Sequence, residues 1–164
     1  KREKKDGRYG LPSCASTCNL LVGRDILERV GATGPIFSHL FCYSGGEDKD
    51  FFIRAYKMGA LLASAEKSVI HRMHDAERYT ARGLIRRGFK NGCSQVNMAR
   101  HHGSANRMPK LFFSALIKFF ISLLVLPFSI GSKKYVLHNL YRMAKAGGVL
   151  YTTMTGRSIK YYSR

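Results

Sequence analysis

Two neighbouring carboxylates, Glu47 and Asp48, are the residues of this 164-residue sequence best suited to acid–base chemistry. A carboxylate on a rigid support can take a proton from a hydroxyl group, which is the role of a general base. The preceding Gly45 and Gly46 favour this interpretation, because they leave room for a substrate to approach the backbone. A helix N-cap is the alternative, since Asp is a preferred capping residue.

A helix is expected to position this acidic pair. Residues 49–58 have the spacing of an amphipathic helix, and Gly59 is suited to end it. Glu47 and Asp48 would then lie at the positive end of the helix dipole, where exposed N–H groups can donate to carboxylate oxygens. The apolar positions that would face a core are Phe51, Phe52, Ala55 and Tyr56.

Short elements are predicted on both sides of this helix. Residues 13–22 suit a buried strand with an apolar end, and residues 26–30 suit a short helix that ends at Gly31. Residues 36–44 are expected to form a loop or a short strand. Residues 60–63 and 68–71 are expected to form two further strands, the second ending at His71.

Several of these features occur together, in this order and spacing, in a known enzyme family. They are Asn19 to Arg24, Gly46-Glu47-Asp48, Arg54, Gly59 and the strand ending at His71. With them the chain resembles the C-terminal, acceptor-side half of a family 2 glycosyltransferase of the GT-A fold, of the membrane-associated bacterial type that builds polysaccharide or lipid-linked saccharide. The resemblance covers about residues 13–92, and it is more specific than any single motif. Thr17-Cys18 departs from it, because the family often has glycine just before the Asn.

The resemblance implies transfer of a sugar from a nucleotide-sugar donor to a lipid-linked or polysaccharide acceptor, with inversion. Asp48 would be the base that deprotonates the acceptor hydroxyl, and Glu47 would position the acceptor or the base. The implied substrate-binding residues are Asn19, Gly45, Gly46 and Arg54.

A divalent metal, Mg²⁺ or Mn²⁺, is also implied. It would bridge the donor diphosphate and neutralise the leaving group, and His71 would be its ligand on this chain. A strand-end histidine bonded to the backbone is the alternative. Cys14 and Cys18 could also meet a metal with His71 and His74, but the spacing matches no zinc pattern, and reduced thiols are expected instead.

The fold class expected from the resemblance is α/β. Residues 1–102 would form part of a GT-A, nucleotide-diphospho-sugar transferase fold, and residues 103–164 a mainly helical, membrane-interacting region. The nucleotide-binding half, with its Asp-x-Asp motif, is expected before Lys1. Asp48-Lys49-Asp50 has the letters of that motif but falls on the helix start. The fragment alone is therefore not expected to be active.

A strong positive charge predicts polyanionic partners. The 28 lysines and arginines exceed the 10 acidic residues, for a formal net charge of +18. Residues 75–102 suit a helix beginning at Asp75 or Thr80, whose glycines allow close approach to a neighbour. Arg86 and Arg87 of this helix are the candidates for recognition of substrate phosphates. The alternative is that they belong to a solvated basic face. A basic nucleic-acid-binding module is the alternative function, although no recognised motif supports it.

The second informative stretch, residues 111–130, is apolar and long enough to cross a bilayer core of about 30 Å. Lys118 opposes a simple span at a cost of roughly 2.5–3.5 kcal/mol. Ser114, Lys118 and Ser122 form a polar stripe typical of a helix lying in the interface, and both flanks are basic. We expect an in-plane or re-entrant anchor on the anionic cytoplasmic face of the inner membrane. The alternatives are a core helix of a soluble domain and a membrane-bound scaffold without catalysis. A last helix is expected over residues 135–146, broken at Gly147-Gly148.

Overall fold

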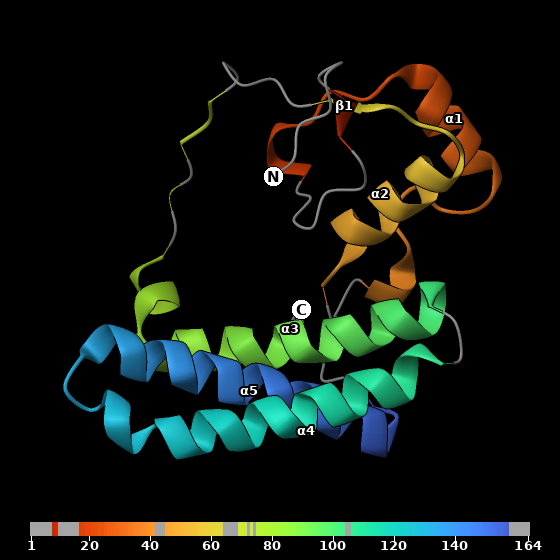
Figure 1. Ribbon diagram of the computed structural model, residues 1–164. Coiled ribbons are helices and arrows are strands. Elements are labelled where there is room, and N and C mark those ends of the chain that lie inside the picture. The colour runs from red at the N-terminus through yellow and green to blue at the C-terminus, as the bar shows by residue number, and fades with distance from the viewer. Residues whose placement is uncertain are drawn as a thin grey trace. The chain divides into compact units, whose positions relative to one another are not determined.

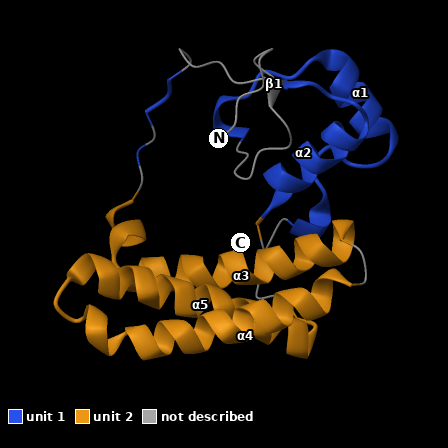
Figure 2. Ribbon diagram, in the orientation of Figure 1, with its two compact units in different colours: residues 1–42, 46–73 blue, residues 43–45, 74–164 orange. Residues whose placement is uncertain are grey.

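Helices dominate the computed structural model of the chain (Figure 1). The structure describes residues 8–9, 17–41, 45–63, 69–71, 73, 75–103 and 106–157. The chain divides into two compact units, which Figure 2 shows in different colours. The first unit contains residues 1–42 and 46–73, and the second contains residues 43–45 and 74–164.

Two α-helices carry most of the core of the first unit. α1 (Arg24–Ala32) and α2 (Glu47–Lys57) confirm the two helices predicted there, and Gly59 follows α2 with a left-handed φ of 84°. Two 3₁₀ turns, η1 (Thr17–Asn19) and η2 (His39–Phe41), complete the helical elements. Tyr56 is 47% exposed and lies outside the core, in contrast to its predicted position. The buried core residues are Val30, Phe51, Phe52, Ala55 and Ala60.

The prediction of an α/β fold is wrong, because the described part of the chain is mainly helical. Its strands are β1 (Arg8–Tyr9) and β2 (Leu62–Ala63), which form one antiparallel pair. The apolar run expected to end a buried strand has no strand at residues 20–22, and Leu21 is 99% exposed. Residues 69–71 are not a strand either, and Ser68 lies outside the described residues. A strand is stable only when neighbouring strands pair with it, and two residues on each side provide little pairing.

Three long helices form the second unit. They are α3 (Ala81–His102), α4 (Arg107–Val125) and α5 (Lys133–Thr155). The most extensive packing is between α3 and α5, and α4 packs mainly on α5 (Figure 1). Short 3₁₀ turns, η3 (Ala76–Tyr79) and η4 (Pro127–Ser129), precede α3 and follow α4. The predicted domain boundary at residue 102 coincides with the end of α3. The division of the chain into its two units falls instead between residues 73 and 74.

Thr80 caps the first turn of α3. Its hydroxyl oxygen accepts a hydrogen bond of 3.0 Å from the N–H of Gly83, so Thr80 rather than Asp75 begins the helix. The cap satisfies one of the N–H groups that a helix start leaves without an intrahelical partner.

Glycines make the close contact between α3 and α5 possible. A Cβ atom at Gly92 would collide with the carbonyl oxygen of Lys145, and one at Gly148 would collide with that of Phe89. The prediction that α5 breaks at Gly147-Gly148 is therefore wrong, because α5 continues to Thr155. Packing against α3 outweighs the low helix propensity of glycine, which costs about 1 kcal/mol per residue.

α4 exposes most of its apolar surface. By length and composition it could cross a membrane, and only 11% of its most apolar window is buried inside the protein. A core helix of a soluble domain would be mostly buried, so this exposure argues against that alternative. The exposed apolar residues on one face include Phe113, Ile117, Phe120, Ile121 and Leu124.

Candidate functional site

A glycine turn places the two predicted catalytic carboxylates in the first turn of α2. Gly46 is the N-cap residue, with a φ of 112°, and its carbonyl accepts the N–H of Asp50 at 2.9 Å. Glu47 and Asp48 are the first two helical residues, so Asp48 is not the N-cap. The positive φ requires glycine, because side chains rarely tolerate this backbone conformation.

The Asp48 carboxylate is held by Thr17. The Thr17 hydroxyl donates to Oδ1 at 2.7 Å, and the Thr17 N–H donates a longer bond of 3.4 Å to Oδ2. Asp48 is half-buried, so its carboxylate is oriented by the protein without being enclosed by it. Thr17 is a residue of the candidate site that the sequence did not reveal, since 31 positions separate it from Asp48.

Glu47 has an unsatisfied oxygen beside this carboxylate. Its Oε2 atom is buried and has no hydrogen-bond partner among the described residues, although the side chain as a whole is half-buried. A buried acceptor without a donor is costly, commonly by about 1–3 kcal/mol.

Arg54, which the resemblance implies in substrate binding, forms contacts within the first unit. Its guanidinium pairs with the carboxylate of Asp50 at 2.8 Å and donates to the carbonyl of Ile36 at 2.6 Å. The Arg54 side chain is 16% exposed, and Asp50 is fully buried. These contacts give Arg54 a structural role, and its role in substrate binding stays a prediction.

The remaining predicted residues of the first unit are exposed. Asn19 ends η1, and His71 lies in a segment without regular structure. Within the described residues, His71 belongs to no group of three potential metal ligands. The assignment of His71 as a metal ligand therefore stays a prediction. Cys14 and His74, the other members of the possible metal cluster, lie outside the described residues.

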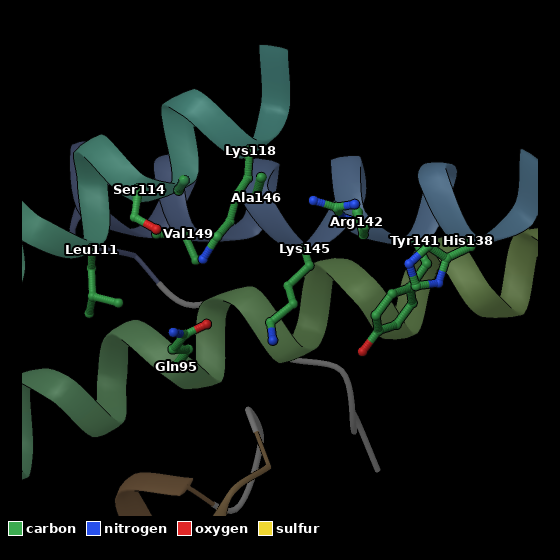
Figure 3. A pocket seen from close by; sticks show the side chains of 11 residues that line it. Gln95, Leu111, Ser114, Lys118, His138, Tyr141, Arg142, Lys145, Ala146 and Val149 are labelled. Atoms are coloured by element: carbon green, nitrogen blue, oxygen red, sulfur yellow. The ribbon is translucent and has the colours of Figure 1, made fainter. Parts of the chain in front are cut away.

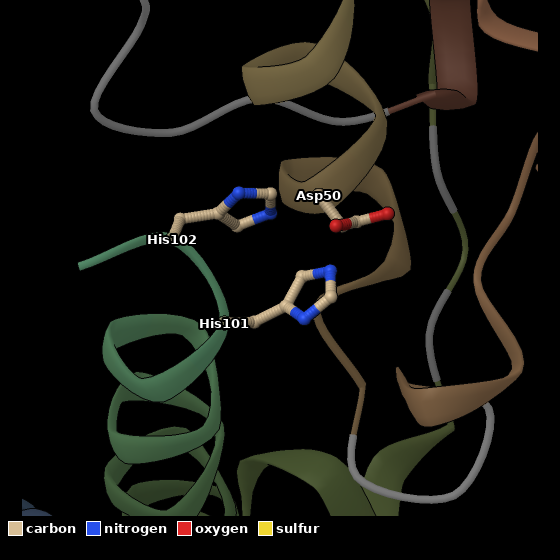
Figure 4. A group of neighbouring side chains, drawn as sticks. All are labelled: Asp50, His101 and His102. Atoms are coloured by element: carbon tan, nitrogen blue, oxygen red, sulfur yellow. The ribbon is translucent and has the colours of Figure 1, made fainter. Parts of the chain in front are cut away.

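Figure 4 draws three other side chains of metal-ligating type, which belong to different units of the chain. Asp50 belongs to the first unit, where its carboxylate is paired with Arg54. His101 and His102 belong to the second unit, and their rings meet edge to face with centroids 4.7 Å apart.

Gly45 and the two predicted phosphate-binding arginines belong to the second unit. The Gly45 carbonyl accepts the Ser94 hydroxyl at 2.8 Å, and its φ of 73° again requires glycine. Arg86 is exposed on α3. Arg87 is half-buried and lines a cavity of about 590 Å³ together with Lys134 and other residues of α5.

A second cavity, of about 270 Å³, lies within the three-helix unit (Figure 3). Its cationic lining comes from Lys118 on α4 and from Arg142 and Lys145 on α5. Ser114 also lines it, and Ser122, further along the same stripe, is fully buried. The polar stripe of α4 therefore lines the three-helix unit at Ser114 and Ser122, while Lys118 lines the cavity and is exposed. The in-plane or re-entrant anchor stays a prediction.

No protein-family model, curated protein or solved structure matches this chain.

Proposed function

We propose that this protein is a membrane-associated glycosyltransferase in which Asp48 is the catalytic base. The observation that carries the proposal is the placement of Asp48 in the first turn of α2, directly after a positive-φ glycine turn and held by the Thr17 hydroxyl. A general base needs a fixed direction and access to its substrate, and a half-buried, oriented carboxylate has both.

In the proposed reaction the acceptor hydroxyl attacks the anomeric carbon of a nucleotide-sugar. The new bond joins the acceptor oxygen to that carbon, the bond from the carbon to the donor diphosphate breaks, and the hydroxyl proton passes to Asp48. Oδ2 is the atom suited to receive it, because Oδ1 already accepts the short bond from Thr17. Glu47, directly before Asp48 in the first turn of α2, would position the acceptor or the base.

The acceptor in this proposal is a polysaccharide or a lipid-linked saccharide at the cytoplasmic face of the inner membrane. The order of Asn19, Gly46-Glu47-Asp48 and Arg54 along the chain supports the class of reaction. Arg87, half-buried beside Lys134, supports recognition of substrate phosphates, for which guanidinium groups are well suited. A role for Mg²⁺ or Mn²⁺ remains a prediction, and none of these steps depends on it.

Membrane association in this proposal rests on α4. An exposed apolar face removes large side chains from water when it enters a bilayer, and each nearby Lys or Arg adds about 1 kcal/mol on an anionic leaflet. The basic residues that flank α4 and the turn after it are Arg107, Lys110, Lys133 and Lys134. Pro127 and the turn at η4 then return the chain to α5, which packs on α4.

A transfer assay on the full-length natural protein tests the proposal. Membranes containing the protein are incubated with UDP- and GDP-sugars, and release of nucleoside diphosphate and labelling of the acceptor fraction are followed. We expect wild-type activity and its loss in Asp48→Asn. The matched control is Asp25→Asn, which changes a carboxylate exposed on α1.

Two results would count against the proposal. Full activity in Asp48→Asn would exclude this carboxylate as the base. Vesicle binding by the full-length protein without transfer of any sugar tested would favour the non-catalytic, membrane-binding alternative.

A further inference from the structure

The second unit carries an excess of positive charge that its own residues cannot neutralise. Residues 78–164 contain sixteen lysines and arginines and no aspartate or glutamate. The acidic residues of this unit are Asp75 and Glu77, at the turn before α3. Any anion that balances the charges further along the three helices must therefore come from outside this unit.

The charges converge on the cavity of about 270 Å³ between the three helices. Figure 3 shows Lys118 extending from α4 and Lys145 extending from α5 toward α3, where Gln95 faces them. Arg142 and His138 of α5 also line the cavity. Three permanent cations on one small cavity repel one another, and an anion among them removes that repulsion.

The cationic groups of this cavity are available to a ligand. Within the described part of the chain, the charged ends of Lys118, Arg142 and Lys145 form no hydrogen bond or ion pair. Neutral hydrogen-bonding groups stand beside them on Gln95 and Ser114. A guanidinium fork, two ammonium groups and neutral donors form a set that suits a phosphate group.

Apolar residues line another part of the same cavity. They are Leu111, Ala115, Ala146 and Val149. The opposite face of α4 exposes Phe113, Ile117 and Phe120 to the surroundings. A ligand that carries a phosphate on an apolar chain would match both features, with its phosphate in the cavity and its chain along α4.

We propose that this cavity between α3, α4 and α5 binds a phosphate group, supplied in the membrane by the headgroup of an anionic lipid. The lipid source rests on the membrane association in the proposed function, whereas phosphate binding itself does not. The residues of this site belong to the second unit, whereas the carboxylates of α2 belong to the first. A phosphate ligand would bind the three-helix unit at a defined place, in addition to the general attraction between its basic residues and negative surfaces.

Binding measurements on the full chain test this proposal in three arms. Inorganic phosphate is titrated calorimetrically. Co-sedimentation then compares phosphatidylcholine vesicles that contain phosphatidate with vesicles that contain oleate at equal negative charge. The test variant is Lys118→Gln/Lys145→Gln. Its control, Lys110→Gln/Lys133→Gln, removes the same charge from α4 and α5 at residues that line neither cavity.

We expect the wild-type chain to prefer phosphatidate over oleate vesicles. The cavity variant should lose at least about tenfold of its affinity for phosphatidate vesicles relative to oleate vesicles of equal charge, the effect of removing charge-assisted hydrogen bonds. The control should weaken binding to both kinds of vesicle alike, by about 1 kcal/mol for each lysine, and should keep the preference for phosphatidate. A further outcome is that inorganic phosphate binds as tightly as the vesicles do, with the same dependence on Lys118 and Lys145. That result would support the phosphate site and would identify free phosphate, not a lipid headgroup, as its ligand.

The same loss of phosphatidate preference in the two double variants would overturn the proposal. So would a wild-type chain that neither prefers phosphatidate nor binds inorganic phosphate. Circular dichroism and thermal unfolding establish that both variants are folded. Failure here leaves the Asp48 assay unaffected. If Asp48→Asn loses activity while the two double variants show the same preference for phosphatidate, only the phosphate site is rejected.

Discussion

At the scale of single residues, the contact between Thr17 and Asp48 has the clearest consequence for function. Thr17 touches the proposed base through its hydroxyl and its backbone N–H. It is a positioning residue, because it acts on the acceptor only through the Asp48 carboxylate. Because 31 positions separate Thr17 from Asp48, this contact is a feature of the chain that only its structure reveals.

Replacing Thr17 with Val removes the hydroxyl and keeps the shape of the side chain. We expect kcat to fall by roughly tenfold with KM little changed, because the carboxylate loses its short hydrogen bond and its fixed direction. Thr17→Ser should restore the rate, since it restores the donor. The control is Thr33→Val, which removes the bond from a threonine hydroxyl to the Val30 carbonyl on α1. Equal rates in Thr17→Val and wild type would show that Thr17 does not orient the base.

The pair of Arg54 with buried Asp50 gives a prediction about stability. Arg54→Met removes the cation beside a fully buried carboxylate, so the free energy of unfolding should fall by about 3 kcal/mol or more. Arg24→Met removes an exposed partner of Glu28 and should cost less than about 0.5 kcal/mol. Urea unfolding of the variants measures both. A stable Arg54→Met protein with weakened substrate binding would instead support the role implied by the family resemblance.

At the scale of elements, the sequence predicted helices better than strands: the strand expected at residues 60–63 contains β2, whereas residues 20–22 and 69–71 form none. The apolar spacing of residues 49–58 and the glycine at position 59 are local signals, and they gave α2 to within two residues at its start. The strand predicted over residues 13–22, of which residues 17–22 are described and form no strand, depended on partners elsewhere in the chain, which no local pattern supplies. The helix break predicted at Gly147-Gly148 is wrong for the same reason, because the fit of Gly148 against α3 is a long-range property.

Two adjacent glycines of α5 should respond in opposite directions to the same change. A Cβ atom at Gly148 would meet the backbone of Phe89 and Cys93, whereas one at Gly147 would meet nothing within 4 Å. Gly148→Ala should therefore lower the free energy of unfolding by about 1–3 kcal/mol through overpacking. Gly147→Ala should raise it by roughly 0.5–1 kcal/mol through helix propensity. Denaturant unfolding followed by circular dichroism compares them, and a similar effect of both changes would contradict the close contact of α3 with α5.

At the scale of the whole molecule, chemistry and membrane attachment are assigned to different units. The first unit holds the carboxylates of α2, and the second holds the apolar face of α4 and the basic cavities. The candidate base and the basic helix could be predicted from the sequence, because each is a local run of residues. Thr17 beside Asp48, and Lys118 beside Lys145, join distant positions and required the folded chain.

Membrane attachment should depend on the exposed face of α4. The double change Phe120→Ser/Leu124→Ser removes two exposed apolar side chains and should weaken vesicle binding by roughly tenfold for each, at about 1.5 kcal/mol per buried side chain. The control, Leu21→Ser/Leu61→Ser, removes two exposed apolar side chains from the first unit. Flotation with anionic vesicles measures the difference, and equal weakening in both proteins would refute attachment through α4.

The most direct measurement is the rate of sugar transfer by the full-length protein with Asp48 replaced by Asn. The amide can still accept the Thr17 hydroxyl at Oδ1 but cannot take a proton from the acceptor. General-base catalysis contributes about 10²–10⁴ in rate, so kcat should fall by at least about a hundredfold while Asp25→Asn retains wild-type activity. Transfer at the wild-type rate by a folded Asp48→Asn protein would contradict the assignment of Asp48 as the base.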